Sequence, residues 1–335
     1  MRWVNVENQA SWRDLHELSA RRQPFTADDD PHRVADWVQA VYVRTSRDAE
    51  LIRAVQRTVR RNGSTKRHWL GLDAPANSGK SEMLLRFAIG IHHQAGDHGS
   101  DHAGDHAGDQ ARDQARAPQA ATFRRVPIIY VQADSGQQGA GLLRAIAEAA
   151  GMPSQGNEDA LRRRLAHVLP QLGTLIVIVD DAHMLRRVSD RATKLTDSMR
   201  ASLRLPVTFI FAGAGLHTSA LLRVGGPVGY ESTEQLHSRH TMLTFSPLTL
   251  RNDLDFLRRL IGDYLKILAT VLPHLETPFR SDNATLGKLV DATDGKVGAL
   301  MSLLKDGTVE ALHHQNPLTS NLLLELASHQ EPSPR

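Results

Sequence analysis

The sequence contains no cysteine. Disulfide bonds, and zinc or iron–sulfur sites with cysteine ligands, are therefore excluded. It also lacks an apolar run long enough to span a bilayer, which takes about 20 residues, and an apolar signal core near its first residue. These absences are compatible with a reducing cytoplasm. We therefore expect a cytoplasmic protein without a membrane partner.

A strong charge of either sign is absent as well. The chain has 40 Lys and Arg against 37 Asp and Glu, a formal net charge of only +3. So weak a basic excess permits a nucleic-acid partner but does not argue strongly for one. The 41% apolar and 23% charged residues among 335 are ordinary for a globular protein with one large or two modest domains.

One stretch, residues 68–90, has the order of a P-loop. A short apolar run at residues 69–72 is followed by a loop of small residues, then by Lys80, Ser81 and an amphipathic run at 83–91. Lys80 is predicted to reach the β- and γ-phosphates of ATP, and the Ser81 hydroxyl to ligate Mg²⁺. The loop residues expected to surround the phosphates are Ala74, Pro75, Ala76, Asn77, Ser78 and Gly79.

The spacing G-x-x-x-x-G-K-[ST] is met except at its first position, which is Ala74. Alanine can stand there if its φ stays negative, so this departure weakens the match without breaking it. The alternative is a chance Gly-Lys-Ser in an ordinary loop. That alternative loses weight when a second nucleotide-binding element lies downstream.

Residues 175–179 are the most apolar strand pattern in the chain, and Asp180 and Asp181 follow at once. An unbroken run rich in β-branched residues is typical of a central parallel strand covered on both faces. Acids at its carboxyl end lie where open α/β sheets bind ligands. In this Walker B pattern, Asp180 would hold Mg²⁺ or its water shell, and Asp181 would polarise an attacking water. The alternative is a strand followed by two solvated acids.

The remaining periodicity divides the chain into three parts. We expect an N-terminal arm and helices over 1–62, a nucleotide-binding core over 63–247 and a helical lid over 248–330. An Asp-His repeat over 96–121 is predicted to be a disordered insert, the alternative being a metal site if it were helical. Further strands are expected at 126–131, 207–211 and 240–245, and helices at 141–150, 160–172, 186–203, 252–268, 284–292 and 297–313.

The second of two helices expected over residues 31–62 has a basic face. Arg53, Arg57, Arg60 and Arg61 share its polar side. A solvated helix face is one interpretation of this pattern. A surface that contacts phosphate backbones is the other.

This order of motifs resembles an AAA+ ATPase, and several stretches resemble the transposition ATPases of the TniB/TnsC type. The resemblance covers residues 34–312, and it implies an α/β AAA+ P-loop NTPase fold: a parallel five-stranded sheet flanked by helices, with a C-terminal helical lid domain. The matching stretches are VPIIYVQAD (126–134), LIVIVDDAHML (175–185), LRLPVTFIFAGAG (203–215), EQLHSRHTMLTFSPL (234–248) and TDGKVGALMSLLKDG (293–307).

The resemblance also implies a role. Proteins of this type are ATP-dependent regulators that oligomerise on double-stranded DNA as rings or filaments and recruit or activate a transposase, together with a target-selection protein. Arg239 matches the arginine that reaches a neighbouring subunit's γ-phosphate. Lys296, in the turn that opens the last expected lid helix, lies near the sensor 2 region. The alternative function is an ATP-binding signalling or scaffold NTPase that does not act on DNA.

Two departures from the family pattern predict slow hydrolysis. Asp181 stands where a glutamate is usual, and its carboxylate is set back by one methylene. Ala214 stands where a polar sensor 1 side chain often lies. Because a general base must lie within hydrogen-bond reach of its water, we expect turnover at or below about 1 per second.

Overall fold

In the computed structural model, the residues described are 15, 17, 20, 21, 23–26, 29–63, 67–100, 125–134, 139–185, 203–216, 240–279 and 281–329. They fall into two compact units. The sheet unit comprises Met1–Gln9, Ile52–Asp73 and Ser81–Leu243. The helical unit comprises Ala10–Leu51, Ala74–Lys80 and Thr244–Arg335.

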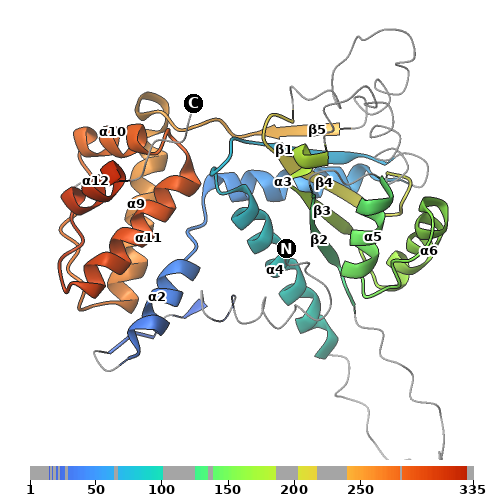
Figure 1. The fold of residues 1–335 in the computed structure, drawn as a ribbon, viewed down its shortest axis with the longest axis horizontal. Coiled ribbons are helices and arrows are strands. Elements are labelled where there is room, and N and C mark those ends of the chain that lie inside the picture. Colours follow the sequence, from blue (N-terminus) through green and yellow to red (C-terminus); the bar gives the residue numbers. More distant parts are fainter. Residues whose placement is uncertain are drawn as a thin grey trace, which may run out of the picture. The chain divides into compact units, whose positions relative to one another are not determined.

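A five-stranded parallel sheet, as predicted, is the centre of the sheet unit (Figure 1). Its spatial order is β2-β3-β4-β1-β5. The paired strands β1 and β4, β3 and β4, and β2 and β3 all run parallel. The strands are β1 (Trp69–Asp73), β2 (Ile128–Gln132), β3 (Ile176–Asp180), β4 (Thr208–Gly213) and β5 (His240–Thr244).

The burial of the strands follows from their sequences. Every residue of β1, β3 and β4 is buried, because these mostly apolar strands lie inside the sheet. The apolar run before Asp180 is shorter than predicted, since Leu175 precedes β3 and is 56% exposed. Parallel strands end at one edge of a sheet. Asp73, Asp180 and Gly213 therefore share that edge.

Helices α5 (Gly139–Ala149) and α6 (Glu158–Gln171) pack together in the core of the sheet unit through residues such as Ile146 and Leu165. Helix α3 (Ser46–Arg61) continues into this unit, where the apolar side chain of Ile52 is 41% exposed. Helix α4 (Lys80–Ser100) includes the first residues of the Asp-His repeat. The rest of the repeat, and all but the last residue of the helix predicted over 186–203, lie outside the described residues.

The helical unit contains α2 (Pro31–Ala40), α9 (Leu250–Val271), α10 (Asn283–Ala292), α11 (Val297–His313) and α12 (Ser320–His329). One apolar core joins these helices, with Trp37 and Tyr264 among its largest buried side chains. The Tyr264 hydroxyl lies 2.8 Å from Thr308 Oγ1. The expectation that 297–313 is the last helix is wrong: the short, Leu-rich α12 follows it and places Leu323 in the same core.

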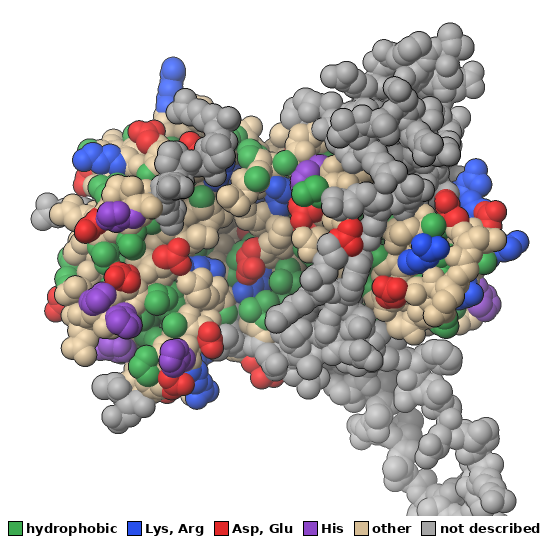
Figure 2. Space-filling view, viewed as in Figure 1, with side chains coloured by type: hydrophobic (Ala, Val, Ile, Leu, Met, Phe, Trp, Pro, Cys, Tyr) green, Lys and Arg blue, Asp and Glu red, His purple; other side chains and the backbone are tan. Residues whose placement is uncertain are grey.

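Charged side chains of both signs are interspersed on the visible face of the helical unit, with histidines among them (Figure 2). Such mixing is typical of a solvated surface. No helix among the described residues is long and apolar enough to cross a membrane.

Candidate nucleotide-binding site

The loop between β1 and α4 has the backbone of an anion-binding turn. Asn77 has φ 59° and Gly79 has φ 82°, with Ser78 between them outside the positive region. Alternation of left-handed with right-handed residues turns successive N–H groups toward one side, which is the geometry of an anion nest. Ala74 does not adopt a positive φ. Alanine is therefore compatible with this position, where the motif usually has glycine.

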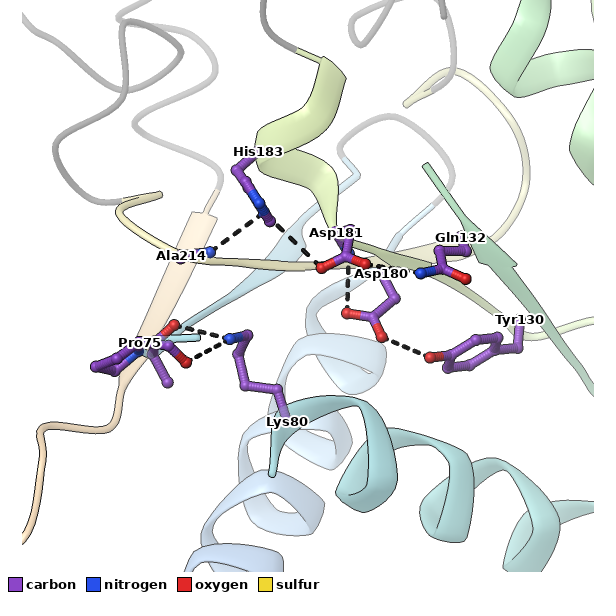
Figure 3. Close-up of polar contacts among 9 residues, drawn as sticks. Pro75, Lys80, Tyr130, Gln132, Asp180, Asp181, His183 and Ala214 are labelled. Carbon is purple, nitrogen blue, oxygen red and sulfur yellow. Dashed lines mark hydrogen bonds and ion pairs between the residues drawn. The ribbon is translucent and has the colours of Figure 1, made fainter. Parts of the chain in front are cut away.

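Lys80, the first residue of α4, folds back onto this loop (Figure 3). Its side-chain Nζ donates to the carbonyl oxygens of Ala74 at 2.9 Å and Pro75 at 2.7 Å, and the residue is only 8% exposed. The ammonium group therefore lies at the mouth of the loop, where phosphate oxygens could take over its hydrogen bonds.

Ser78 supplies an observation that fits a phosphate ligand. Its Oγ is buried and has no hydrogen-bond partner among the described residues. A buried hydroxyl without a partner is costly, and such groups are normally satisfied by protein, water or ligand. A phosphate oxygen in the loop would accept its proton.

The beginning of α11 lies directly against the same loop, within the helical unit. The Ala299 N–H donates to the Asn77 carbonyl at 3.0 Å. A Cβ atom added to Gly298 would lie 2.5 Å from that carbonyl oxygen and 2.6 Å from the Gly79 nitrogen. Lys296, expected near the nucleotide, is the N-cap residue of this helix, and its Nζ donates to Asp294 Oδ2 at 3.1 Å.

Asp180 ends β3 and is completely buried. Its Oδ2 accepts a 2.6 Å hydrogen bond from the Tyr130 hydroxyl, and its Oδ1 accepts the Asp181 N–H at 2.9 Å (Figure 3). Burial, followed by the negative charge of Asp180, raises the pKa of the Tyr130 phenol. The phenol therefore stays protonated and remains a donor.

Asp181 follows in a left-handed conformation, φ 51°, which aspartate tolerates better than most residues. Its Oδ2 accepts a 2.8 Å hydrogen bond from Gln132 Nε2. His183 Nδ1 lies 4.0 Å from its Oδ1, too far for a hydrogen bond. That nitrogen instead accepts the Ala214 N–H at 3.4 Å, so the neutral ring carries its proton on Nε2. Ala214, which has no polar side chain, thus holds a polar ring beside Asp181.

The predicted residues therefore form two groups. In the sheet unit, Asp180 and Asp181 lie together at the end of β3, bound to Tyr130 and Gln132 of β2, and Ser81 belongs to the same unit. In the helical unit, the loop residues up to Lys80 meet the start of α11. Arg239 lies outside the described residues.

Sequence reasoning missed three residues: Tyr130, Gln132 and Gly298. The first two are polar residues two apart in an otherwise apolar strand, so they share one face of β2. Two polar residues at this spacing in a buried strand could have indicated a functional face of β2. The contact of Gly298 with the loop depends on tertiary packing, which the local sequence does not specify.

The donor set fits a magnesium ion held together with phosphates. Among the residues described, no three Asp, Glu or His side chains are grouped to hold a metal by themselves. Mg²⁺ is commonly bound by one or two carboxylates together with substrate phosphates. Ser81 and Asp180 match that requirement.

The comparisons with known proteins agree with this fold. Residues 67–218 match the family described as AAA domain. No curated protein matches the sequence.

Three solved structures align with this chain, and the first of them, with a TM-score above 0.5, shares its fold. ORC1 of Aeropyrum pernix, solved in complex with DNA, is 18% identical with a TM-score of 0.54, over 88% of this chain and 66% of that one. A Walker-type ATPase of Pyrococcus abyssi is 16% identical with a TM-score of 0.49, over 86% and 72%. The Thermotoga maritima branch migration motor RuvB is 13% identical with a TM-score of 0.39, over 84% and 67%.

The parallel sheet, the loop before α4 and the acid-ended β3 have the architecture of an AAA+ P-loop NTPase fold. The similarity to the AAA domain family covers residues 67–218 of the 335. This chain spans about two thirds of the length of the ORC1 chain that it matches.

Proposed function

We propose that the protein is an ATP-dependent regulator of DNA transposition of the TniB/TnsC type. It binds ATP and Mg²⁺, oligomerises on double-stranded DNA irrespective of sequence, and recruits or activates a transposase with a target-selection protein. The observation that carries the nucleotide-dependent part is the loop itself, with its left-handed Asn77 and Gly79, its folded-back Lys80 and its unpartnered Ser78 hydroxyl. The transposition part rests on the resemblance of the ordered sequence stretches.

Each residue of the site has a role in this proposal. Lys80 exchanges two loop carbonyls for phosphate oxygens, while the loop N–H groups surround the phosphates. Ser81 and Asp180 hold the magnesium ion, which neutralises phosphate charge when bound. Asp181, oriented by Gln132, accepts a proton from the attacking water.

Helix α3 offers the surface best suited to a DNA backbone. Its four arginines are exposed and recur at intervals of four, three and one residue, so they form one stripe. None of the ion pairs among the described residues involves them. Free guanidinium groups in a stripe can neutralise successive phosphates without reading bases. They are Arg53, Arg57, Arg60 and Arg61.

Assembly is the third part of the proposal. Arg239, by its place before β5, matches the arginine that completes a neighbouring subunit's site in the resembling family. A subunit that needs a neighbour's arginine hydrolyses ATP efficiently only in an oligomer. The Arg239→Ala variant should therefore lose assembly or its ATPase without losing nucleotide binding.

The test is whether duplex DNA stimulates both ATP turnover and assembly. Steady-state ATPase assays with and without DNA should show stimulation. Electron microscopy with DNA and a non-hydrolysable ATP analogue should show rings or filaments. A strict monomer with DNA-independent turnover would reject the proposal in favour of an ATP-binding signalling or scaffold protein.

A further inference from the structure

Tyr130 contacts one of the two residues assigned to the magnesium ion. Its hydroxyl donates to Asp180 Oδ2 at 2.6 Å. We propose that Tyr130 is a positioning residue of the magnesium site, which orients the Asp180 carboxylate. This inference rests on the proposed ATP–Mg²⁺ binding.

The sheet fixes the position of the phenol. Tyr130 lies on β2 and pairs with Ile178, while Gln132 pairs with Asp180. Residues two apart on a strand point to the same face, so Ile178 and Asp180 share one face of β3. Tyr130 pairs with Ile178 and therefore lies on that face too. The aromatic ring spans the two-residue offset along the strands, and Figure 3 shows it pointing at the carboxylate. A rigid side chain on a strand holds such a geometry more accurately than one on a loop.

The polarity of this hydrogen bond suits a cation. The phenol gives its only proton to Asp180, so the carboxylate is held as an acceptor and keeps its negative charge toward a metal. Asp180 accepts one N–H and one O–H through different oxygens, so each oxygen keeps a lone pair.

The Tyr130–Asp180 hydrogen bond should affect metal binding more than nucleotide binding. The loop residues that surround the phosphates do not contact Tyr130 through any hydrogen bond among the described residues. Outer partners that orient metal ligands typically contribute about 10- to 100-fold in metal affinity. Removing the hydroxyl should therefore raise the magnesium requirement and leave metal-free nucleotide affinity unchanged.

The experiment compares Tyr130→Phe with wild type. Binding of a fluorescent ATP analogue is measured in EDTA and then across a magnesium titration. We expect equal affinity in EDTA and a magnesium midpoint about 10- to 100-fold higher in the variant. The matched control is Tyr264→Phe, which removes another buried tyrosine hydroxyl, bound to Thr308 in the helical unit. It should titrate with magnesium like wild type.

A second measurement needs no variant. Magnesium added to the nucleotide complex should shift the ¹³Cζ resonance of Tyr130, while the Tyr264 resonance stays in place. A wild-type magnesium midpoint in folded Tyr130→Phe, or an unshifted Tyr130 signal, overturns the inference while the proposed function stands. Wild-type protein that binds no nucleotide under either condition overturns the proposed function, and this inference with it.

Discussion

Lys80 is bound to loop carbonyls in the structure and is also the residue proposed to bind the phosphates of ATP. Lys80 is nearly buried, and its ammonium satisfies two loop carbonyls. A buried ammonium group needs such partners, because an unpaired charge in this environment is costly. Phosphate oxygens are stronger partners than neutral carbonyls, since charge-assisted hydrogen bonds are roughly twice as strong. Lys80 can therefore exchange its hydrogen bonds to the loop carbonyls for hydrogen bonds to phosphate oxygens.

We predict that Lys80→Ala abolishes detectable ATP–Mg²⁺ binding in calorimetry. The matched control is Lys305→Ala, which removes another lysine that donates to a backbone carbonyl, that of Gln39 at 2.7 Å. The control should bind nucleotide like wild type. Unchanged affinity in folded Lys80→Ala protein would show that the loop is not the nucleotide site.

Asp181 combines a short side chain with an unusual backbone. Its φ of 51° and its hydrogen bond from Gln132 hold the carboxylate close to the end of β3. Glutamate, with one more methylene, would reach further toward an attacking water. His183 accepts the Ala214 N–H on Nδ1, so its Nε2–H remains available as a donor. These contacts are compatible with the prediction that Asp181 is a slow general base. The Nε2–H of His183 is a second group that could orient the attacking water.

We predict wild-type turnover at or below about 1 per second in steady-state assays, with and without DNA. Asp181→Glu should turn over faster, because the longer side chain restores hydrogen-bond reach to the water. Asp181→Asn, which cannot accept a proton, should be slower by about 100-fold or more with nucleotide binding retained. Wild-type turnover of tens per second, or a slower Asp181→Glu, would mean that the site is built around aspartate.

At the scale of elements, helix α11 and the P-loop share a backbone contact. The helix begins at Val297, and its first turn approaches the loop so closely that only glycine fits at position 298. The Ala299 N–H, one of the free donors at a helix start, is satisfied by the Asn77 carbonyl. A shift of the loop on phosphate binding would therefore displace the start of α11 directly.

We predict that Gly298→Ala weakens ATP–Mg²⁺ binding by about 10-fold or more, because its Cβ would overlap the Asn77 carbonyl and the Gly79 nitrogen. Gly262→Ala in α9 is the matched control. No atom lies within 4 Å of a Cβ at that site. Alanine there should raise the free energy of unfolding by roughly 0.5–1 kcal/mol and leave affinity unchanged. Equal ATP–Mg²⁺ affinities in the Gly298→Ala and Gly262→Ala proteins would contradict a coupling between α11 and the P-loop.

Some of these elements could be predicted from the sequence, and others could not. The parallel sheet could be predicted because β1, β3 and β4 are mostly apolar runs, and the loop because its residue order is specific. Helix α12 was missed, since Ser320–His329 is short and its Leu-rich pattern has no strong period. The Tyr130–Asp180 pair joins residues 50 positions apart and depends on strand order, which local patterns do not encode. Roles assigned to Arg239 and Lys296 remain predictions.

For the whole molecule, the distribution of charge matters more than its sum. A formal net charge of +3 would attract DNA only weakly if it were spread evenly. The described surface of the helical unit mixes both signs (Figure 2). The arginine stripe on α3 departs from this mixture, and phosphate binding depends on local positive charge through the release of counterions.

We predict that replacing all four arginines of the α3 stripe with glutamine weakens binding to duplex DNA and lowers the slope of log K against log salt by up to about 4. The loss should be equal for unrelated DNA sequences, because phosphate contacts carry no base information. Fluorescence anisotropy across a salt series measures both quantities. The control removes the same charge from scattered exposed residues, Arg163, Arg251, Arg259 and Lys288. If the control lowers the slope as much as the stripe variant, overall charge rather than α3 governs binding. If neither variant changes it, DNA binds elsewhere or not at all.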